Sequence, residues 1–166
     1  AVCAANALGI SSEEAVDTLS QFGEEASRQK IVETPWGFVI DDTYNAGPES
    51  MAASLGVLRD MDADIKIAAL GDMLELGVLS EESHRKVGRL ASEAAGVLLA
   101  VGPQSVIYYD TFDGLRKMHV SDSSEGARVL SPIIRDYAQR GLKVGVLVKG
   151  SHAIRMNLIS EALIND

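Results

Sequence analysis

From Ile65 onward, short apolar runs alternate with stretches that carry apolar residues at helical spacing. The runs are IKIAAL, GVLLAV, KMHV and KVGVLV, and their lack of strict polar alternation is typical of strands buried on both faces of a parallel sheet. The residues that share helical faces are Met51, Leu55 and Leu58; Val87, Leu90, Ala91 and Ala94; Ala127, Leu130, Ile134 and Tyr137; and Ile154, Leu158 and Ala162. This alternation predicts an α/β fold in which helices cover both sides of the sheet.

Two further apolar runs precede this region. RQKIVET and FVIDD are joined by the short turn PWG, which predicts an antiparallel hairpin. The complete prediction is therefore a Rossmann-like three-layer αβα fold with a mostly parallel six-stranded sheet and an antiparallel hairpin strand at its amino-terminal end. Residues 1–22 indicate the end of one helix, a break at Gly9 and a second helix capped by Ser11 and Glu14. Because the chain opens within a helix and without methionine, we expect it to be a piece of a longer protein.

Length and charge restrict the possible classes of protein. The 166 residues are 46% hydrophobic, which suits one domain with a small appendage, and 24 acidic against 15 basic side chains give a net charge of -9. This charge disfavours nonspecific binding to nucleic acid or an anionic membrane. The single cysteine, Cys3, suits a reducing cytoplasm, and no apolar run approaches the roughly 18 residues of a membrane helix.

Polar residues gather where strands lead into helices, which is where open α/β sheets bind ligands. In DDTYNAGPES, Gly47 and Pro48 fit the N-cap and first turn of a helix, and Glu49 complements its dipole. A turn needs only one or two Asx residues, so a ligand site and a simple turn both remain open for the rest of the cluster. That remainder is Asp41, Asp42, Tyr44 and Asn45.

A second stretch, GDMLELGVLSEESH, reads as a turn at Gly71 and Asp72 followed by a helix with Ser80 at its N-cap. His84 is interpreted as a surface or capping histidine rather than a metal ligand, since no second histidine or cysteine lies at ligand spacing. The sequence therefore predicts no metal site.

The third stretch, KGSHAIRM, follows a predicted buried strand. Lys149, Gly150 and Ser151 would stand at a helix N-terminus, where free N–H groups favour a carboxylate or phosphate. The alternative, slightly favoured on the residues alone, is that Ser151 is an N-cap and Lys149 a solvated charge. Arg155 could face either way.

Several catalytic signatures are missing from the sequence. It contains no G-x-x-x-x-G-K-[ST] loop, no G-x-G-x-x-G fingerprint, no G-x-S-x-G elbow and no Cys/His nucleophile pair. A self-contained enzyme is therefore not expected.

Taken together and in order, DDTYNAGPESMAASL, LGDMLELGVLSEESHRKVG and VLVKGSHAIRM closely resemble the carboxy-terminal domain of the Mur ligases, from about Ser27 to Leu163. The most similar branch adds D-alanyl-D-alanine to UDP-N-acetylmuramoyl-tripeptide in peptidoglycan synthesis. The resemblance implies an ATP-dependent amide ligase that works through an acyl phosphate in the bacterial cytoplasm. It also implies that residues 1–25 end a central ATPase domain, whose ATP and Mg²⁺ sites lie upstream, and that residues 26–166 form the carboxy-terminal domain.

The resemblance assigns roles to individual residues. Arg28 would reach the ATP phosphates, Asp42 would accept hydrogen bonds from the ribose, and Tyr44 and Asn45 would line the nucleotide and acceptor side of the cleft. The residues that would face the incoming dipeptide are Asn45, Lys149, Gly150, Ser151, His152 and Arg155. No catalytic residue is implied in these 166 residues alone, which would have no ligase activity and at most weak ATP binding.

Three positions depart from the family pattern: Ser27 replaces glycine, Gly47 replaces asparagine and His152 replaces arginine. The last change removes a permanent charge beside the expected carboxylate site. One alternative is a sister ligase that adds an amino acid or a folate glutamate chain, although the diaminopimelate-adding type would carry K-G-H-E where this chain has K-G-S-H. The other is a non-catalytic α/β binding module. A monomer is expected.

Overall fold

A six-stranded sheet forms the centre of the molecule. The computed structural model describes residues 2–21 and 29–165, and the strands lie in the order β1-β2-β6-β3-β4-β5. Only β1 is antiparallel to its neighbour, so the predicted mostly parallel sheet with an antiparallel hairpin is confirmed. The strands are β1 (Lys30–Thr34), β2 (Gly37–Asp42), β3 (Ile65–Gly71), β4 (Val97–Val101), β5 (Arg116–Val120) and β6 (Val144–Lys149).

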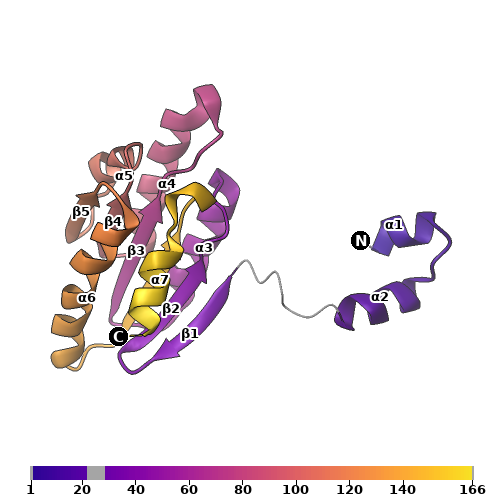
Figure 1. The fold of residues 1–166 in the computed structure, drawn as a ribbon, viewed down its shortest axis with the longest axis horizontal. Coiled ribbons are helices and arrows are strands. Elements are labelled where there is room, and N and C mark those ends of the chain that lie inside the picture. The colour runs from indigo at the N-terminus through magenta and orange to yellow at the C-terminus, as the bar shows by residue number, and fades with distance from the viewer. Residues whose placement is uncertain (1, 22–28, 166) are drawn as a thin grey trace.

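Helices cover both faces of the sheet, as predicted (Figure 1). One face packs against α3 (Pro48–Asp60), α4 (Ser80–Ala94) and α5 (Val106–Thr111). The other packs against α6 (Ser123–Gln139) and α7 (Asn157–Ile164). The central strands β3, β4 and β6 are mostly apolar because successive side chains enter opposite cores, whereas the edge strands β1 and β5 carry exposed polar residues.

Strand β2 shows how this alternation positions a polar residue. Phe38 and Ile40 belong to the core under α3 and α4, whereas Val39 belongs to the core under α6 and α7. By the same period of two, Asp42 at the end of β2 points to the α3 side and Asp41 to the α7 side. The two adjacent carboxylates therefore serve different faces of the sheet.

The helices differ from the prediction in three places. Helix α5 was not predicted, because six residues rich in aromatic and β-branched side chains give little helical periodicity. Ser80 is the first residue of α4 rather than its cap, and a short 3₁₀ helix, η1 (Gly77–Leu79), precedes it. After β6 comes a second 3₁₀ helix, η2 (His152–Ile154), and α7 begins only at Asn157.

That late start moves the buried face of α7. Ile159, Ser160 and Leu163 are buried, whereas the predicted face of Ile154, Leu158 and Ala162 is only half-buried. The other predicted faces are confirmed, with Met51, Leu55 and Leu58 fully enclosed on α3.

Near the amino terminus, α1 (Val2–Ala7) and α2 (Ser12–Gln21) contact each other across the break at Gly9. The predicted capping interaction of α2 is present, since the Glu14 N–H donates to Ser11 Oγ at 3.1 Å. Among the residues that the structure describes, no helix is long and apolar enough to cross a membrane.

The position of β6 decides where a ligand could bind. It lies between β2 and β3, and the chain leaves those two strands toward α3 and α4 on one face but leaves β6 toward α7 on the other. Loops that diverge in this way open a crevice at the carboxyl ends of the strands, the usual ligand site of an open α/β sheet. All three polar stretches from the sequence lie there.

Gly37 provides a test of the packing between β2 and β6. Its φ is +146°, and an added Cβ would lie 2.0 Å from the carbonyl oxygen of Val144. We expect Gly37→Ala to lower the free energy of unfolding by about 1–3 kcal/mol or more, because rigid backbone must move. Urea unfolding followed by circular dichroism measures this change.

Gly56→Ala is the matched control, because nothing lies within 4 Å of an added Cβ in the interior of α3. That substitution should raise stability by about 0.5–1 kcal/mol through helix propensity. Equal effects at the two positions would contradict the predicted close contact at Gly37.

Candidate functional site

A buried ion pair joins the ends of β2 and β6. Asp42 and Lys149 are register partners in the parallel pair, so their side chains point to the same face of the sheet. Lys149 Nζ lies 2.8 Å from Asp42 Oδ2, and the two side chains are 2% and 8% exposed. The interpretation of Lys149 as a solvated charge is therefore wrong, because its partner comes from a strand 107 residues earlier.

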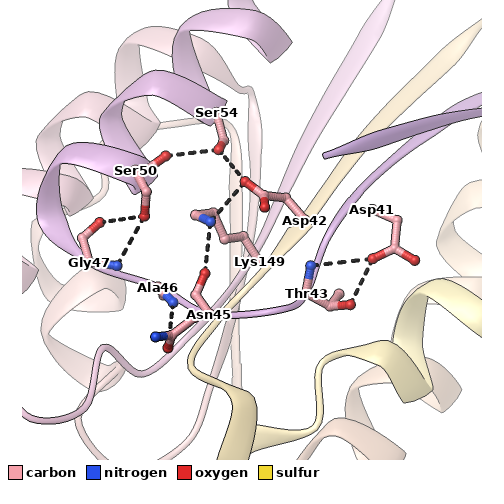
Figure 2. Close-up of polar contacts among 9 residues, drawn as sticks. All are labelled: Asp41, Asp42, Thr43, Asn45, Ala46, Gly47, Ser50, Ser54 and Lys149. Carbon is pink, nitrogen blue, oxygen red and sulfur yellow. Dashed lines mark hydrogen bonds and ion pairs between the residues drawn. The ribbon is translucent and has the colours of Figure 1, made fainter. Parts of the chain in front are cut away.

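Two further groups complete this site (Figure 2). Ser54 Oγ, from α3, lies 2.6 Å from Asp42 Oδ2, and Lys149 Nζ also donates to the backbone carbonyl of Asn45 at 2.8 Å. Both contacts to Asp42 fall on Oδ2 and do not use Oδ1. Sequence reasoning missed Ser54, although its position one turn from Met51 and Leu58 marks it as a polar residue on a buried helix face.

The loop between β2 and α3 is held by its own short-range bonds (Figure 2). Asp41 Oδ1 accepts from Thr43 Oγ1 at 2.7 Å, and Asn45 Oδ1 accepts from the Ala46 N–H at 2.9 Å. Gly47 is the N-cap of α3 and Pro48 its first residue, as predicted. On the α7 side, Asp41 Oδ2 accepts from Ser160 at 3.0 Å. These bonds explain Asp41 on structural grounds, although it also borders a recess on the α7 side. Asp42 borders a cavity on the α3 side.

That cavity measures about 430 Å³ and opens beside the ion pair. It is lined by Gln29, Asp42, Tyr44, Asn45, Ala46, Gly47, Ser50, Ala53, Ser54 and Lys149. Its wall therefore consists of the first polar stretch, the start of α3 and the end of β6. Arg28, expected at ATP phosphates, lies outside the described residues, as does Ser27.

A second cavity, of about 550 Å³, lies between the three polar stretches and is lined by Tyr44, Asn45, Ala46, Leu74, Glu75, Ser151, His152 and Ala153. Ser151 fixes the second stretch to the third, because its N–H donates to the Asp72 carbonyl at 3.0 Å and its Oγ accepts from the Leu74 N–H at 2.8 Å. The structure thus brings Tyr44, Asn45, Ser151 and His152 together.

Arg155 lies on the α7 side of this region. It is exposed and lines a third cavity, of about 640 Å³, together with Lys30, Asp41, Thr43, Tyr44, His152, Ala153 and Asn157. The Tyr44 and His152 rings stand edge to face with centroids 6.4 Å apart. Three potentially cationic side chains, Lys30, His152 and Arg155, therefore border one recess beside the end of β6.

Ser151 is an N-cap, as the alternative interpretation predicted, but of the three-residue 3₁₀ helix η2, and the expected α-helix begins only six residues later at Asn157. Recognition of an anion here would thus depend on side chains rather than on a helix dipole. Gly150 is explained by packing, since an added Cβ would lie 2.9 Å from the Cα of Gly71. This close contact holds the ends of β6 and β3 together.

Asp72 joins the start of the second stretch to the loop that follows β4. It is buried, and its Oδ1 and Oδ2 accept from the N–H groups of Ser105 at 2.7 Å and Gln104 at 3.2 Å. Burial raises the pKa of Asp72 above the ordinary value of 3.8, and the two backbone hydrogen bonds partly offset that rise. Sequence reasoning interpreted Asp72 only as a turn residue.

His84 is also buried, so its interpretation as a surface or capping histidine is wrong. Its ring contacts the backbone of Met73 and Ser80. Within the described ranges, 2–21 and 29–165, no cluster of three or more histidine, cysteine or acidic side chains could hold a metal ion.

Comparison with known proteins identifies the family of this chain. Residues 27–152 match the family described as "Mur ligase, glutamate ligase domain". The chain belongs to the Mur ligase family.

Curated Mur ligases named UDP-N-acetylmuramoyl-tripeptide--D-alanyl-D-alanine ligase are similar to it. The protein from Haemophilus influenzae is 36% identical over 74% of this chain, and that from Escherichia coli K12 is 35% identical over 75%. Each match covers 26% of the relative, so this chain spans about a quarter of the length of those proteins.

Solved Mur ligase structures share the fold. A crystal structure of MurF from Acinetobacter baumannii superposes with a TM-score of 0.80 at 30% identity, covering 99% of this chain and 36% of that one. MurF from Thermotoga maritima in complex with ADP gives a TM-score of 0.71 at 23% identity, covering 99% of this chain and 36% of that one. The chain is thus the carboxy-terminal domain of a MurF-type ligase.

The ion pair predicts strong coupling between Asp42 and Lys149. Lys149→Met would leave a buried carboxylate without its cation, and Asp42→Asn would leave a buried ammonium group. We expect each single variant to lose about 3–5 kcal/mol of unfolding free energy, and the double variant to lose clearly less than their sum. Urea unfolding of the four proteins measures this coupling.

Lys143→Met is the control, because its contact with Asp62 is 3.6 Å long and both side chains are exposed. It should change stability by no more than about 1 kcal/mol. Additive losses at Asp42 and Lys149, or a Lys149→Met effect as small as this control, would contradict the buried pair.

Asp72 predicts a pH dependence of stability. Because its folded-state pKa is raised, the stability it contributes is present below 3.8 and is lost as the pH rises through the folded value. Asp72→Asn does not titrate and leaves one buried N–H without an acceptor, at a cost of about 1–3 kcal/mol. The difference in unfolding free energy between the unchanged protein and Asp72→Asn should therefore be largest at acid pH and shrink toward neutrality. Urea unfolding between about pH 4 and 7 would measure it. A difference in unfolding free energy that grows with pH would contradict the raised pKa of Asp72.

Proposed function

We propose that this chain is the carboxy-terminal domain of an ATP-dependent ligase that joins D-alanyl-D-alanine to UDP-N-acetylmuramoyl-tripeptide. In the proposed reaction ATP phosphorylates the tripeptide carboxylate, and the dipeptide amine attacks the resulting acyl phosphate. Residues 1–25 would end the preceding ATPase domain, which would bind Mg²⁺ and most of the ATP, and the product would be a peptidoglycan precursor made in the bacterial cytoplasm. The observation that carries the proposal is the convergence of the three family stretches on the crevice beside β6.

The nucleotide is assigned to the 430 Å³ cavity. Asp42 would accept hydrogen bonds from the ribose hydroxyls, since its contacts to Lys149 and Ser54 use Oδ2 and leave the other oxygen for such a bond in the liganded domain. A carboxylate paired with Lys149 is a charge-assisted acceptor, which strengthens such a bond. Tyr44 and Asn45 would line the base and acceptor side, and Arg28 would reach the phosphates.

The dipeptide is assigned to the other side of Asn45. Ser151 and His152 border the 550 Å³ cavity, and His152 and Arg155 border the recess beside it. These groups would hold the dipeptide carboxylate, with Lys149 fixing the Asn45 carbonyl. Because His152 stands where the family usually has arginine, Arg155 would supply the permanent charge.

The domain alone would have no ligase activity. Because the preceding domain would bind Mg²⁺ and most of the ATP, chemistry would require closure of this domain onto it. We expect a monomer.

A substitution at Asp42 tests the nucleotide assignment. In a full-length ligase that carries this domain, Asp42→Ala should raise the KM for ATP about tenfold or more, because a charge-assisted hydrogen bond is worth about 1.5–3 kcal/mol. The KM for D-alanyl-D-alanine should change much less. Steady-state phosphate release, measured where circular dichroism shows the variant to be folded, provides both constants.

Asp62→Ala is the control, because Asp62 is fully exposed just before β3, at the opposite end of the sheet. Its kinetic constants should match those of the unchanged enzyme. An unaltered KM for ATP in Asp42→Ala would refute the ribose role, and absence of turnover with D-alanyl-D-alanine in the unchanged enzyme would refute the proposed substrate.

A further inference from the structure

His84 is a fully buried histidine on the second turn of α4. Its Nε2 lies 3.1 Å from the backbone N of Met73, and its Nδ1 lies 2.7 Å from the carbonyl oxygen of Ser80. The ring therefore connects the start of α4 to the stretch that follows β3. His84 lies in the second polar stretch, and none of the roles proposed above uses its side chain.

These two partners determine the tautomer of His84. A backbone N–H can only donate, so Nε2 must be the unprotonated acceptor. A carbonyl can only accept, so Nδ1 must carry the proton. The imidazole is thus neutral, with one defined donor and one defined acceptor.

The ring is held firmly in this orientation. It lies against the ring of Tyr108, with centroids 4.9 Å apart and a tilt of 31°. Burial raises the pKa of Tyr108 well above its ordinary value, so its hydroxyl stays protonated and donates to the Gly71 carbonyl at 3.3 Å. His84 and Tyr108 therefore restrain two ends of the same short segment, Gly71 to Met73.

The residues after Met73 form one wall of the 550 Å³ cavity. Leu74 and Glu75 line it directly, and the Leu74 N–H donates to Ser151 Oγ at 2.8 Å. Glu75 has a φ of 64°, a conformation that is uncommon for a residue with a side chain and needs support from its surroundings. The His84 contact with Met73 is the buried anchor nearest to this turn on its amino-terminal side.

We propose that His84 is a positioning residue for the dipeptide half of the cleft. By accepting from Met73 it fixes the Leu74 N–H, which in turn orients the Ser151 hydroxyl toward the cavity. This inference rests on the proposed function, because it assigns the second cavity to D-alanyl-D-alanine. Its predicted effect is confined to that substrate, since the residues that contact the Asp42 and Lys149 pair do not touch His84.

Two conservative substitutions separate the two halves of the His84 contact. The amide of glutamine reaches the position of Nε2, so His84→Gln can still accept from Met73. The shorter asparagine reaches only the position of Nδ1, so His84→Asn can still donate to Ser80 but leaves the Met73 N–H without an acceptor. Both are polar and uncharged, which makes them a matched pair.

In the full-length ligase, we expect His84→Asn to raise the KM for D-alanyl-D-alanine about tenfold, as loss of one buried hydrogen bond implies. The KM for ATP should stay within about twofold of the unchanged enzyme, and His84→Gln should keep the KM for the dipeptide within about threefold. If His84 served stability alone, both variants would lose stability, and their KM values for the dipeptide would not differ in this way. Equal KM values for the dipeptide in the two variants, or parallel rises for both substrates, would overturn the proposal.

NMR of the 166-residue protein tests the same contact without any enzymatic activity. The ¹⁵N shift of His84 Nε2 should be that of an unprotonated nitrogen, and the amide signals of Met73, Leu74 and Ser151 should move in His84→Asn more than in His84→Gln. A protonated Nε2 would overturn the proposal. Absence of dipeptide turnover in the unchanged ligase would instead refute the proposed function, since the NMR result does not depend on it.

Discussion

The ion pair between Asp42 and Lys149 is the interaction on which the cleft depends. Each charge is enclosed, and an enclosed charge is tolerated only beside a partner and with its other hydrogen-bonding groups satisfied. Ser54 and the Asn45 carbonyl provide these additional contacts. One pair thereby ties together two strand ends, the first turns of α3 and the loop that leads into it.

The strand order explains why these groups meet. Because β6 is the last strand in the chain but lies between β2 and β3, its end faces loops formed more than 70 residues earlier. The contacts of Ser151 with Asp72 and Leu74 follow from the same insertion. A site of this kind forms only when the final strand is in place, so the cleft and the complete sheet are parts of one folded unit.

The sequence predicted the features that depend on local pattern. Alternation of apolar runs with helical faces predicted the αβα layers, and two short runs joined by a tight turn predicted the hairpin. Gly47 and Pro48 predicted the start of α3. Burial of Lys149 and His84 could not be predicted in this way, since each is enclosed by residues distant in the sequence. Helix α5 was missed for a different reason, because its six residues show too little helical periodicity. For Asp42, the period of two along β2 explains the face once the two cores are known, but its partner had to come from β6.

The residues Tyr44, Asn45 and Ala46 border both the cavity assigned to the nucleotide and the one assigned to the dipeptide. They form the wall between two sites, and the bond from Lys149 to the Asn45 carbonyl sets the position of that wall. Because these three residues line both cavities, a substitution among them would alter both sites. The His84 contact acts on the opposite wall of the dipeptide cavity, through Leu74. A ligand there would therefore be held between one wall fixed by an ion pair and another fixed by a neutral histidine, and only the first is shared with the nucleotide.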